Sequence, residues 1–95
     1  MTDEDALRAA AESGDPKAMT ELGVHLYHDD EQDEAAEWFR KAADLGEAEA
    51  MAGLGDYYDF EGDEAEAERW YRRAADLGDA SAIANLEALL AMREG

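Results

Sequence analysis

A stretch of fourteen residues occurs twice in this chain, 32 positions apart. Asp33 to Gly46 reads DEAAEWFRKAADLG, Ala65 to Gly78 reads AEAERWYRRAADLG, and nine of the fourteen positions are identical. Three further sets of residues repeat at the same distance: Gly14, Gly46 and Gly78; Ala18, Ala50 and Ala82; Leu22, Leu54 and Leu86. A fixed period of this size is typical of stacked repeats, in which each unit buries its apolar face only against its neighbours.

Each period contains two apolar patterns at helical spacing. The first follows Asp15 and Pro16, which suit the capping position and the first helical position, and it stops at the acidic segment 29–33. The second stops at Gly46, and its counterpart at Gly78, where a left-handed residue is expected. The apolar positions are Met19, Leu22, Leu26, Ala35, Trp38, Phe39, Ala42, Ala43 and Leu45, then Met51, Leu54, Tyr58, Ala67, Trp70, Tyr71, Ala74, Ala75 and Leu77.

These patterns predict an all-α fold, an α/α solenoid of antiparallel helical hairpins with a 32-residue period and about six helices. We expect a single repeat domain over residues 1–95. It comprises a half-unit helix at 3–14, repeats at 15–46 and 47–78, and a capping half-unit helix at 79–93. A longer repeat protein trimmed at both ends would show the same pattern.

The string A-x-x-x-L-G-x-x-[LY] followed by A-x-x-W-[FY]-R-[RK]-A-A-D-L-G resembles the Sel-one-like repeat (SLR) family, a relative of the tetratricopeptide repeats. The resemblance covers residues 5–92. One departure is that Ala35 follows Gly23 by only twelve positions, whereas the family usually has a longer turn between its helices. The resemblance implies a non-catalytic adaptor that holds a protein or peptide partner along the concave surface formed by the first helix of each unit. Its first copy rests on Ala18, Leu22, Gly23, Leu26, Ala35, Trp38, Phe39, Ala42, Ala43 and Gly46, and its second on Ala50, Leu54, Gly55, Tyr58, Ala67, Trp70, Tyr71, Ala74, Ala75 and Gly78.

The charge of the chain narrows its range of partners. With 26 acidic and 8 basic residues the formal net charge is −18, which repels nucleic acid phosphates and anionic membrane surfaces. The same charge suits a basic protein partner or life at high salt. No apolar run approaches the length of a membrane span, no cysteine is present, and the N-terminal sequence MTDEDALRAA has no secretory signal pattern. We therefore expect a cytoplasmic protein that binds neither nucleic acid nor membrane.

The candidate partner-binding residues are those of the first helix of each unit that fail to repeat. If these helices line a groove, we expect its partner to offer an apolar anchor and at least one Lys or Arg. The same residues could instead be unconstrained surface. The favoured set is Thr20, Val24, Tyr27, His28, Asp56, Asp59 and Phe60, on a groove that also includes Lys17, Glu49 and Ala52.

Several residues that invite a chemical role are better explained without one. Because Trp38 and Trp70 recur at the repeat spacing, we expect them in the core. His25 and His28, beside Asp29 and Asp30, match no known zinc spacing. Residues 59–64 lack the alternation of a calcium loop. With no nucleophile and base pair and no phosphate-binding loop, we expect no catalytic site, no cofactor and no metal.

The last helix is more apolar than a solvent-facing cap requires. We expect Leu89 and Leu90 either to pack on the preceding hairpin or to meet a second protomer, so the chain is a monomer or an end-to-end homodimer. Two other functions remain open at this point. One is an acidic decoy that mimics nucleic acid and occupies a DNA-binding protein, and the other is a purely structural repeat fragment.

Overall fold

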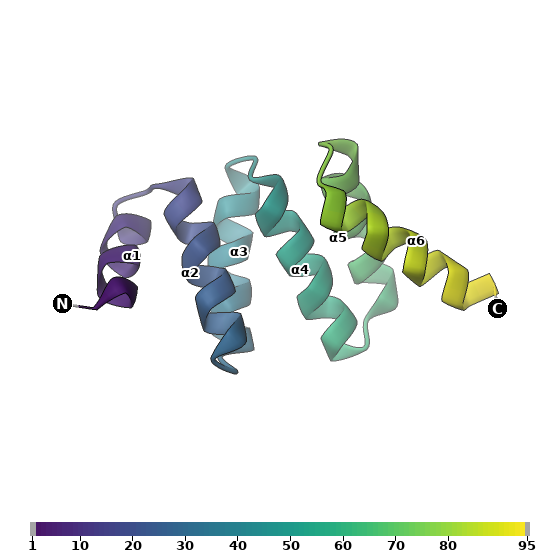
Figure 1. Ribbon diagram of the computed structural model, residues 1–95, viewed down its shortest axis with the longest axis horizontal. Helices are drawn as coiled ribbons and strands as arrows, with labels where there is room; N and C mark the ends of the chain where they lie inside the picture. Colours follow the sequence, from purple (N-terminus) through teal and green to yellow (C-terminus); the bar gives the residue numbers. More distant parts are fainter. Residues whose placement is uncertain (1, 95) are drawn as a thin grey trace.

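Six helices follow one another along an elongated stack (Figure 1), as the repeat period predicts. The computed structural model describes residues 2–94. Within that range the chain is α-helical throughout, apart from short turns and caps. The helices are α1 (Asp3–Glu12), α2 (Pro16–His28), α3 (Gln32–Asp44), α4 (Ala48–Glu61), α5 (Glu64–Asp76) and α6 (Ala80–Glu94).

The helices form two layers. Figure 1 shows α2, α4 and α6 nearest the viewer, with α3 and α5 behind them, and the two ends of the chain at opposite ends of the long axis. The described part measures 48 × 25 × 16 Å. Cα atoms of α2 and α6 lie within 8 Å of α4, whereas across residues 2–94 no such approach joins α3 to α1 or to α5. Because the first helices lie closer together, their layer forms the concave side of the stack.

Glycines end the units where the sequence predicts. Gly14, Gly46 and Gly78 have φ of +102°, +92° and +89°, and each sits in the turn that leads into the next first helix. In each turn the following N–H donates back to the last helical turn, as from Glu47 to the carbonyl of Ala42 at 3.1 Å. The turn inside each hairpin also needs a left-handed residue. It is Gly62 in the second unit (φ +86°) but Asp30 in the first (φ +65°).

Aromatic rings packed on bare glycine backbone join the helices of each hairpin. A Cβ added to Gly23 would lie 2.6 Å from the ring of Phe39, and one added to Gly55 would lie 2.4 Å from the ring of Tyr71. These pairs are equivalent positions of the two units, which explains why the L-G pair of the repeat has no side chain at its second residue. Small residues fill much of the remaining core, and Leu22 and Leu54 are the largest side chains with no exposed surface.

Recurrence does not always mean burial. Trp38 is buried as predicted, whereas Trp70 is only partly buried, packed on the edge of the core. The prediction was wrong for Leu45 and Leu77, which recur but are 57% and 59% exposed. Both are C-cap residues, at the point where the chain leaves the helix, so their side chains no longer follow the buried face.

Candidate functional site

One groove runs along the concave side, between α2, α4 and α6. It encloses about 310 Å³. Its position follows from the two-layer stack, because consecutive first helices lie side by side and small residues separate them. The lining residues are Val24, Tyr27, His28, Phe39, Glu49, Ala52, Gly53, Asp56, Asp79 and Ser81.

The floor of the groove is formed by the bare backbone of Gly53, with the buried ring of Phe39 packed directly beneath it. Phe39 is held between two glycines: a Cβ on Gly53 would lie 2.7 Å from its ring, just as one on Gly23 would lie 2.6 Å from it. Val24 and Ala52 extend this apolar surface along α2 and α4. A side chain at Gly53 would therefore both displace Phe39 and fill the groove.

The rim of the groove is acidic. Glu49 and Asp56 contribute from α4, and Asp79 contributes from the turn before α6. Asp79 also caps that helix, since the N–H of Ala82 donates to its Oδ1 at 2.9 Å. None of the lining residues is Lys or Arg. The groove thus places carboxylates around an apolar floor without an internal cation to neutralise them.

Asp56 is the most constrained of these acids. Its Oδ1 accepts a hydrogen bond from the hydroxyl of Tyr71 at 2.6 Å and another from Nδ2 of Asn85 at 3.3 Å. The pKa of Asp56 is raised, chiefly because neighbouring atoms desolvate the carboxylate, and further because Asp59 and Asp79 repel its charge, although the bond from Tyr71 opposes the shift. The surroundings of Asp56 therefore disfavour its ionised form.

The polar group around Asp56 replaces an apolar group in the first unit. Asp56, Tyr71 and Asn85 occupy the repeat positions of Val24, Phe39 and Gly53. Where the second helix carries Phe, its neighbours are Val and Gly. Where it carries Tyr, they are an Asp that accepts from the hydroxyl and an Asn that donates to the same carboxylate. Part of the variation between units therefore follows from packing, and the Asp56 side chain has a structural role as well as a place in the groove.

Tyr27 crosses from α2 towards α4 at the other side of the groove. Its hydroxyl donates to the carbonyl of Asp56 at 3.4 Å, and its ring meets that of His28 edge-on, with centroids 6.4 Å apart. Burial raises the pKa of Tyr27, and the charges of Asp56 and Asp59 raise it further. Tyr27 is thus half-buried and fixed, so it offers a rigid aromatic wall.

A family model for the Sel1 repeat matches two copies in this chain, at residues 16–47 and 48–79. Together they cover about two thirds of the chain. The chain belongs to the Sel1 repeat family. The matched copies begin one residue later than the units drawn from the sequence period. No curated protein matches the chain in a direct sequence comparison.

Sel1 repeats are generally non-catalytic and mediate protein–protein interaction, so the coarse function of this chain is that of an interaction module. None of the helices in residues 2–94 is long and apolar enough to cross a membrane. Four of the predicted partner-binding residues lie on the concave first-helix face of the two Sel1 repeats.

The structure brings together some of those residues and separates others. Val24, Tyr27, His28 and Asp56 line the one groove. Thr20 does not: it is only 3% exposed, and its hydroxyl donates to the carbonyl of Pro16 one turn earlier. Its prediction as a contact residue was wrong because this position of α2 turns into the helix interface. The two units differ at this position because the first has Thr20 and the second has Ala52, and both are small buried residues.

Phe60 and Asp59 lie at the far end of α4, outside this groove. Phe60 is largely exposed and lines a second hollow of about 280 Å³. That hollow is formed with the turn of the first hairpin, residues 30–33, and with Glu61. Lys17 is exposed and is likewise absent from the groove lining. Of the predicted set, four residues therefore line the groove, Phe60 lines the second hollow, and Thr20 and Asp59 line neither.

The last helix buries one of its two candidate self-association residues. Leu89 is 7% exposed and belongs to the core, which agrees with the first of the two alternatives, packing on the preceding hairpin. The hairpin of the second Sel1 repeat leaves an apolar face that α6 covers, and Leu89 fills it. Leu90 is partly exposed, and Ile83 and Met92 are exposed.

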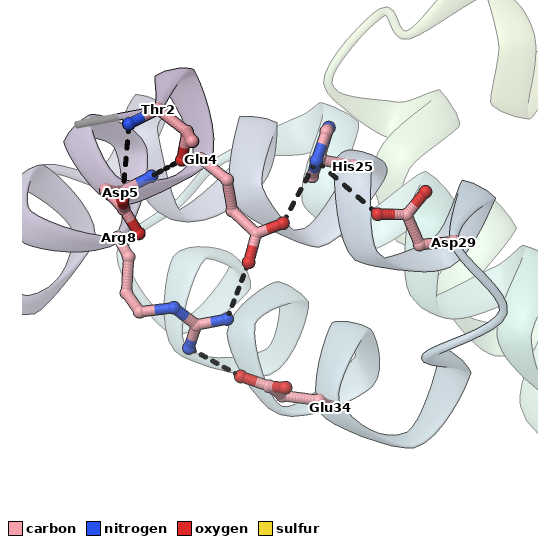
Figure 2. Close-up of polar contacts among 7 residues, drawn as sticks. All are labelled: Thr2, Glu4, Asp5, Arg8, His25, Asp29 and Glu34. Atoms are coloured by element: carbon pink, nitrogen blue, oxygen red, sulfur yellow. Dashed lines mark hydrogen bonds and ion pairs between the residues drawn. The ribbon is translucent and has the colours of Figure 1, made fainter.

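The two histidines of α2 face different ways. His28 lines the groove, whereas His25 points towards α1, with its Nε2 at 3.1 Å from Oε1 of Glu4 and 3.5 Å from Oδ2 of Asp29 (Figure 2). In the sequence the two histidines stand three positions apart beside Asp29 and Asp30, far from Glu4. No sequence signal links residues 21 positions apart on separate helices, so only the packing of α1 on α2 shows this cluster.

Proposed function

We propose that this Sel1 repeat chain binds an extended segment of a partner protein in the groove between α2, α4 and α6, and that the segment inserts a Lys or Arg side chain. The observation that carries the proposal is the acidic rim over an apolar floor. The aliphatic stem of a Lys or Arg would lie on Val24 and on the Gly53 backbone that covers Phe39, while its charged end reaches the carboxylates.

The electrostatics of the rim favour a cation from outside. The raised pKa of Asp56 reflects desolvation and the charges of Asp59 and Asp79, and a bound cation would offset both effects. The net charge of −18 adds a long-range attraction for basic partners, which accelerates association and weakens with added salt. Specificity would come from the shape of the floor and from the walls of Tyr27 and His28.

The test compares two charge reversals on opposite faces of the stack. Glu49→Lys places a cation on the rim of the groove, where Glu49 is exposed and lies among the lining residues. Glu37→Lys makes the same change on α3, where Glu37 is exposed and lines an outer hollow with Arg40, Lys41 and Asp44. Both variants alter net charge equally, so the difference between their affinities for the partner measures the contribution of the groove.

Wild-type protein and both variants serve as baits for capture from the native host, with mass spectrometry of the retained proteins. A retained partner is then purified, and its affinity is measured at fixed ionic strength. We expect Glu49→Lys to weaken binding at least tenfold and Glu37→Lys to weaken it less than twofold. Equal effects would show that general charge, not the groove, holds the partner.

Competition separates this proposal from an acidic decoy. Short duplex DNA is added to the captured complex at the same ionic strength. If the chain is a decoy, duplex DNA should displace it from the captured partner. If the groove binds a segment of the partner, a short peptide copied from that segment should displace the partner, and the Lys/Arg→Ala version of the peptide should not. Displacement by DNA alone would overturn the groove proposal.

A further inference from the structure

Three metal-ligand side chains from two helices converge beside the N-terminal end of the stack. Glu4 lies in the first turn of α1, His25 lies in the last turn of α2, and Asp29 is the C-cap of α2. One ligand atom from each residue lies within 4.8 Å of the other two. Figure 2 shows Glu4 and Asp29 directed at the imidazole of His25 from two sides.

The two distances from His25 suit a small divalent ion, and the carboxylate oxygens of Glu4 and Asp29 lie within 4.8 Å of each other. Zinc binds imidazole nitrogen and carboxylate oxygen at about 2.0–2.2 Å, so ligand atoms at tetrahedral corners stand about 3.3–3.6 Å apart. His25 Nε2 lies 3.1 Å from Glu4 Oε1 and 3.5 Å from Asp29 Oδ2. We propose that Glu4, His25 and Asp29 bind one zinc-like divalent transition-metal ion, with water completing its coordination.

Neighbouring contacts hold the carboxylate of Glu4 and the backbone of Asp29 in place. The Nη2 of Arg8 pairs with Glu4 Oε2 at 3.3 Å, which leaves Oε1 directed at His25. Arg8 is itself held through Nη1, which donates to Glu34 at 2.7 Å, and this bond is the main reason that the pKa of Glu34 is lowered. The backbone N–H of Asp29 donates to the carbonyl of His25 at 3.2 Å. The Glu4 oxygen is thus positioned before any ion arrives, and the helix end fixes the point from which the Asp29 side chain extends.

The donor set selects the kind of ion. An imidazole with two carboxylates suits zinc and similar late transition metals, whereas magnesium and calcium prefer sites made of oxygen atoms alone. His25 and Asp29 are exposed and Glu4 is partly exposed, so the ion reaches the site from solvent and retains water. We expect micromolar affinity for this open three-ligand site.

Such an ion would fasten the terminal helix. In residues 2–94, α2 is the only helix whose Cα atoms lie within 8 Å of those of α1, and the Arg8–Glu34 ion pair is a side-chain link from α1 to α3. A metal that joins Glu4 to His25 and Asp29 binds the docked form of α1 and not the undocked form, so it stabilises the folded end of the stack. This inference is independent of the groove on the concave side.

The test uses zinc chloride and protein purified without a histidine tag, in a buffer that does not bind metal. Isothermal titration should show one saturable site, and zinc should raise the melting temperature. His25→Ala should abolish both effects. The matched control is His28→Ala, which removes the other histidine of the same helix turn and should retain both.

Two further variants examine the carboxylates. Glu4→Gln and Asp29→Asn keep the size of each side chain and should each weaken zinc binding at least tenfold, while circular dichroism without zinc confirms that they are folded. Hydrogen exchange should show that zinc protects the amides of α1. Equal losses in His25→Ala and His28→Ala would overturn the proposal in favour of a histidine pair at the helix end.

Two other results would also overturn it. Absence of saturable binding at high micromolar zinc is one, since it would show that the three side chains form only an ion-pair cluster. The second is displacement of the bound zinc by millimolar magnesium, because general attraction of cations to the acidic surface would then account for binding.

Discussion

The hydrogen bond between Tyr71 and Asp56 provides the sharpest test of how the two repeats are built. Tyr71 is only 3% exposed, and its hydroxyl donates to Asp56 at 2.6 Å. The first unit carries Phe39 and Val24 at the same positions. Asp56→Val therefore introduces a side chain that already fits this position of the fold, but it removes the acceptor of the tyrosine hydroxyl.

The expected magnitudes follow from the cost of a buried, unpaired hydroxyl. Asp56→Val should lower the free energy of unfolding by about 1–3 kcal/mol, because Tyr71 loses its acceptor. In a chain of this size each kcal/mol corresponds to roughly 4–8 °C in melting temperature. Tyr71→Phe alone should cost less, since the carboxylate it leaves behind is partly open to water. In the Tyr71→Phe background, adding Asp56→Val should lower the free energy of unfolding little further than Tyr71→Phe alone. This difference corresponds to a coupling energy of about 1–2 kcal/mol between the two residues.

The four proteins of this double-mutant cycle are wild type, Asp56→Val, Tyr71→Phe and the double variant. Their free energies of unfolding are measured at neutral pH by urea unfolding followed by far-ultraviolet circular dichroism. Asp56→Asn serves as the control, because it removes the charge and keeps an acceptor oxygen, and it should be at least as stable as wild type. If Asp56→Val costs the same in the Tyr71→Phe background as it does in wild type, the hydroxyl does not explain why the two units differ, and the reasoning fails.

Four further outcomes follow from single features of the fold. Gly55→Ala should destabilise by about 1–3 kcal/mol by thermal unfolding, against the helix preference for alanine, because its Cβ would lie 2.4 Å from the ring of Tyr71. Asp30→Gly should stabilise by up to about 1 kcal/mol since Asp30 has φ of +65°, and the converse change Gly62→Asp should destabilise; the same sign for both would refute the strain argument. The folded pKa of Asp56 is raised, so its ionisation reduces stability as pH rises through that value. Asp56→Asn should therefore exceed wild type in unfolding free energy at neutral pH, and this advantage should vanish below about pH 4, the ordinary range of aspartate. Finally, the net charge of −18 predicts a melting temperature that rises from low to moderate NaCl, and a flat profile would exclude important repulsion.

The period predicted the helices and their turns well because both depend on short-range interactions. Apolar spacing sets the buried face of each helix, and glycine permits the left-handed turns at Gly46 and Gly78. The same argument failed at Leu45 and Leu77, where the helix ends before the side chain can pack. Recurrence identifies equivalent positions but does not tell whether the position is buried.

The candidate site was predictable only in part. The rule that binding residues fail to recur selected Val24, Tyr27, His28 and Asp56, which the stack places on one groove. It also selected Thr20, which is buried. A position can differ between units because it contacts a partner or because its packing neighbour differs, and a single sequence does not separate these causes.

The sequence by itself determined the repeat, its period, the alternation of first and second helices and the Sel1 family, because each of these depends on residues close together in the chain or equivalent between units. Only the tertiary structure decided which differences matter. It showed that Asp56 accompanies Tyr71 as Val24 accompanies Phe39, and that Glu4 meets His25 across two helices. Such contacts depend on how far one helix is rotated and shifted against the next, and a periodic pattern does not specify that register.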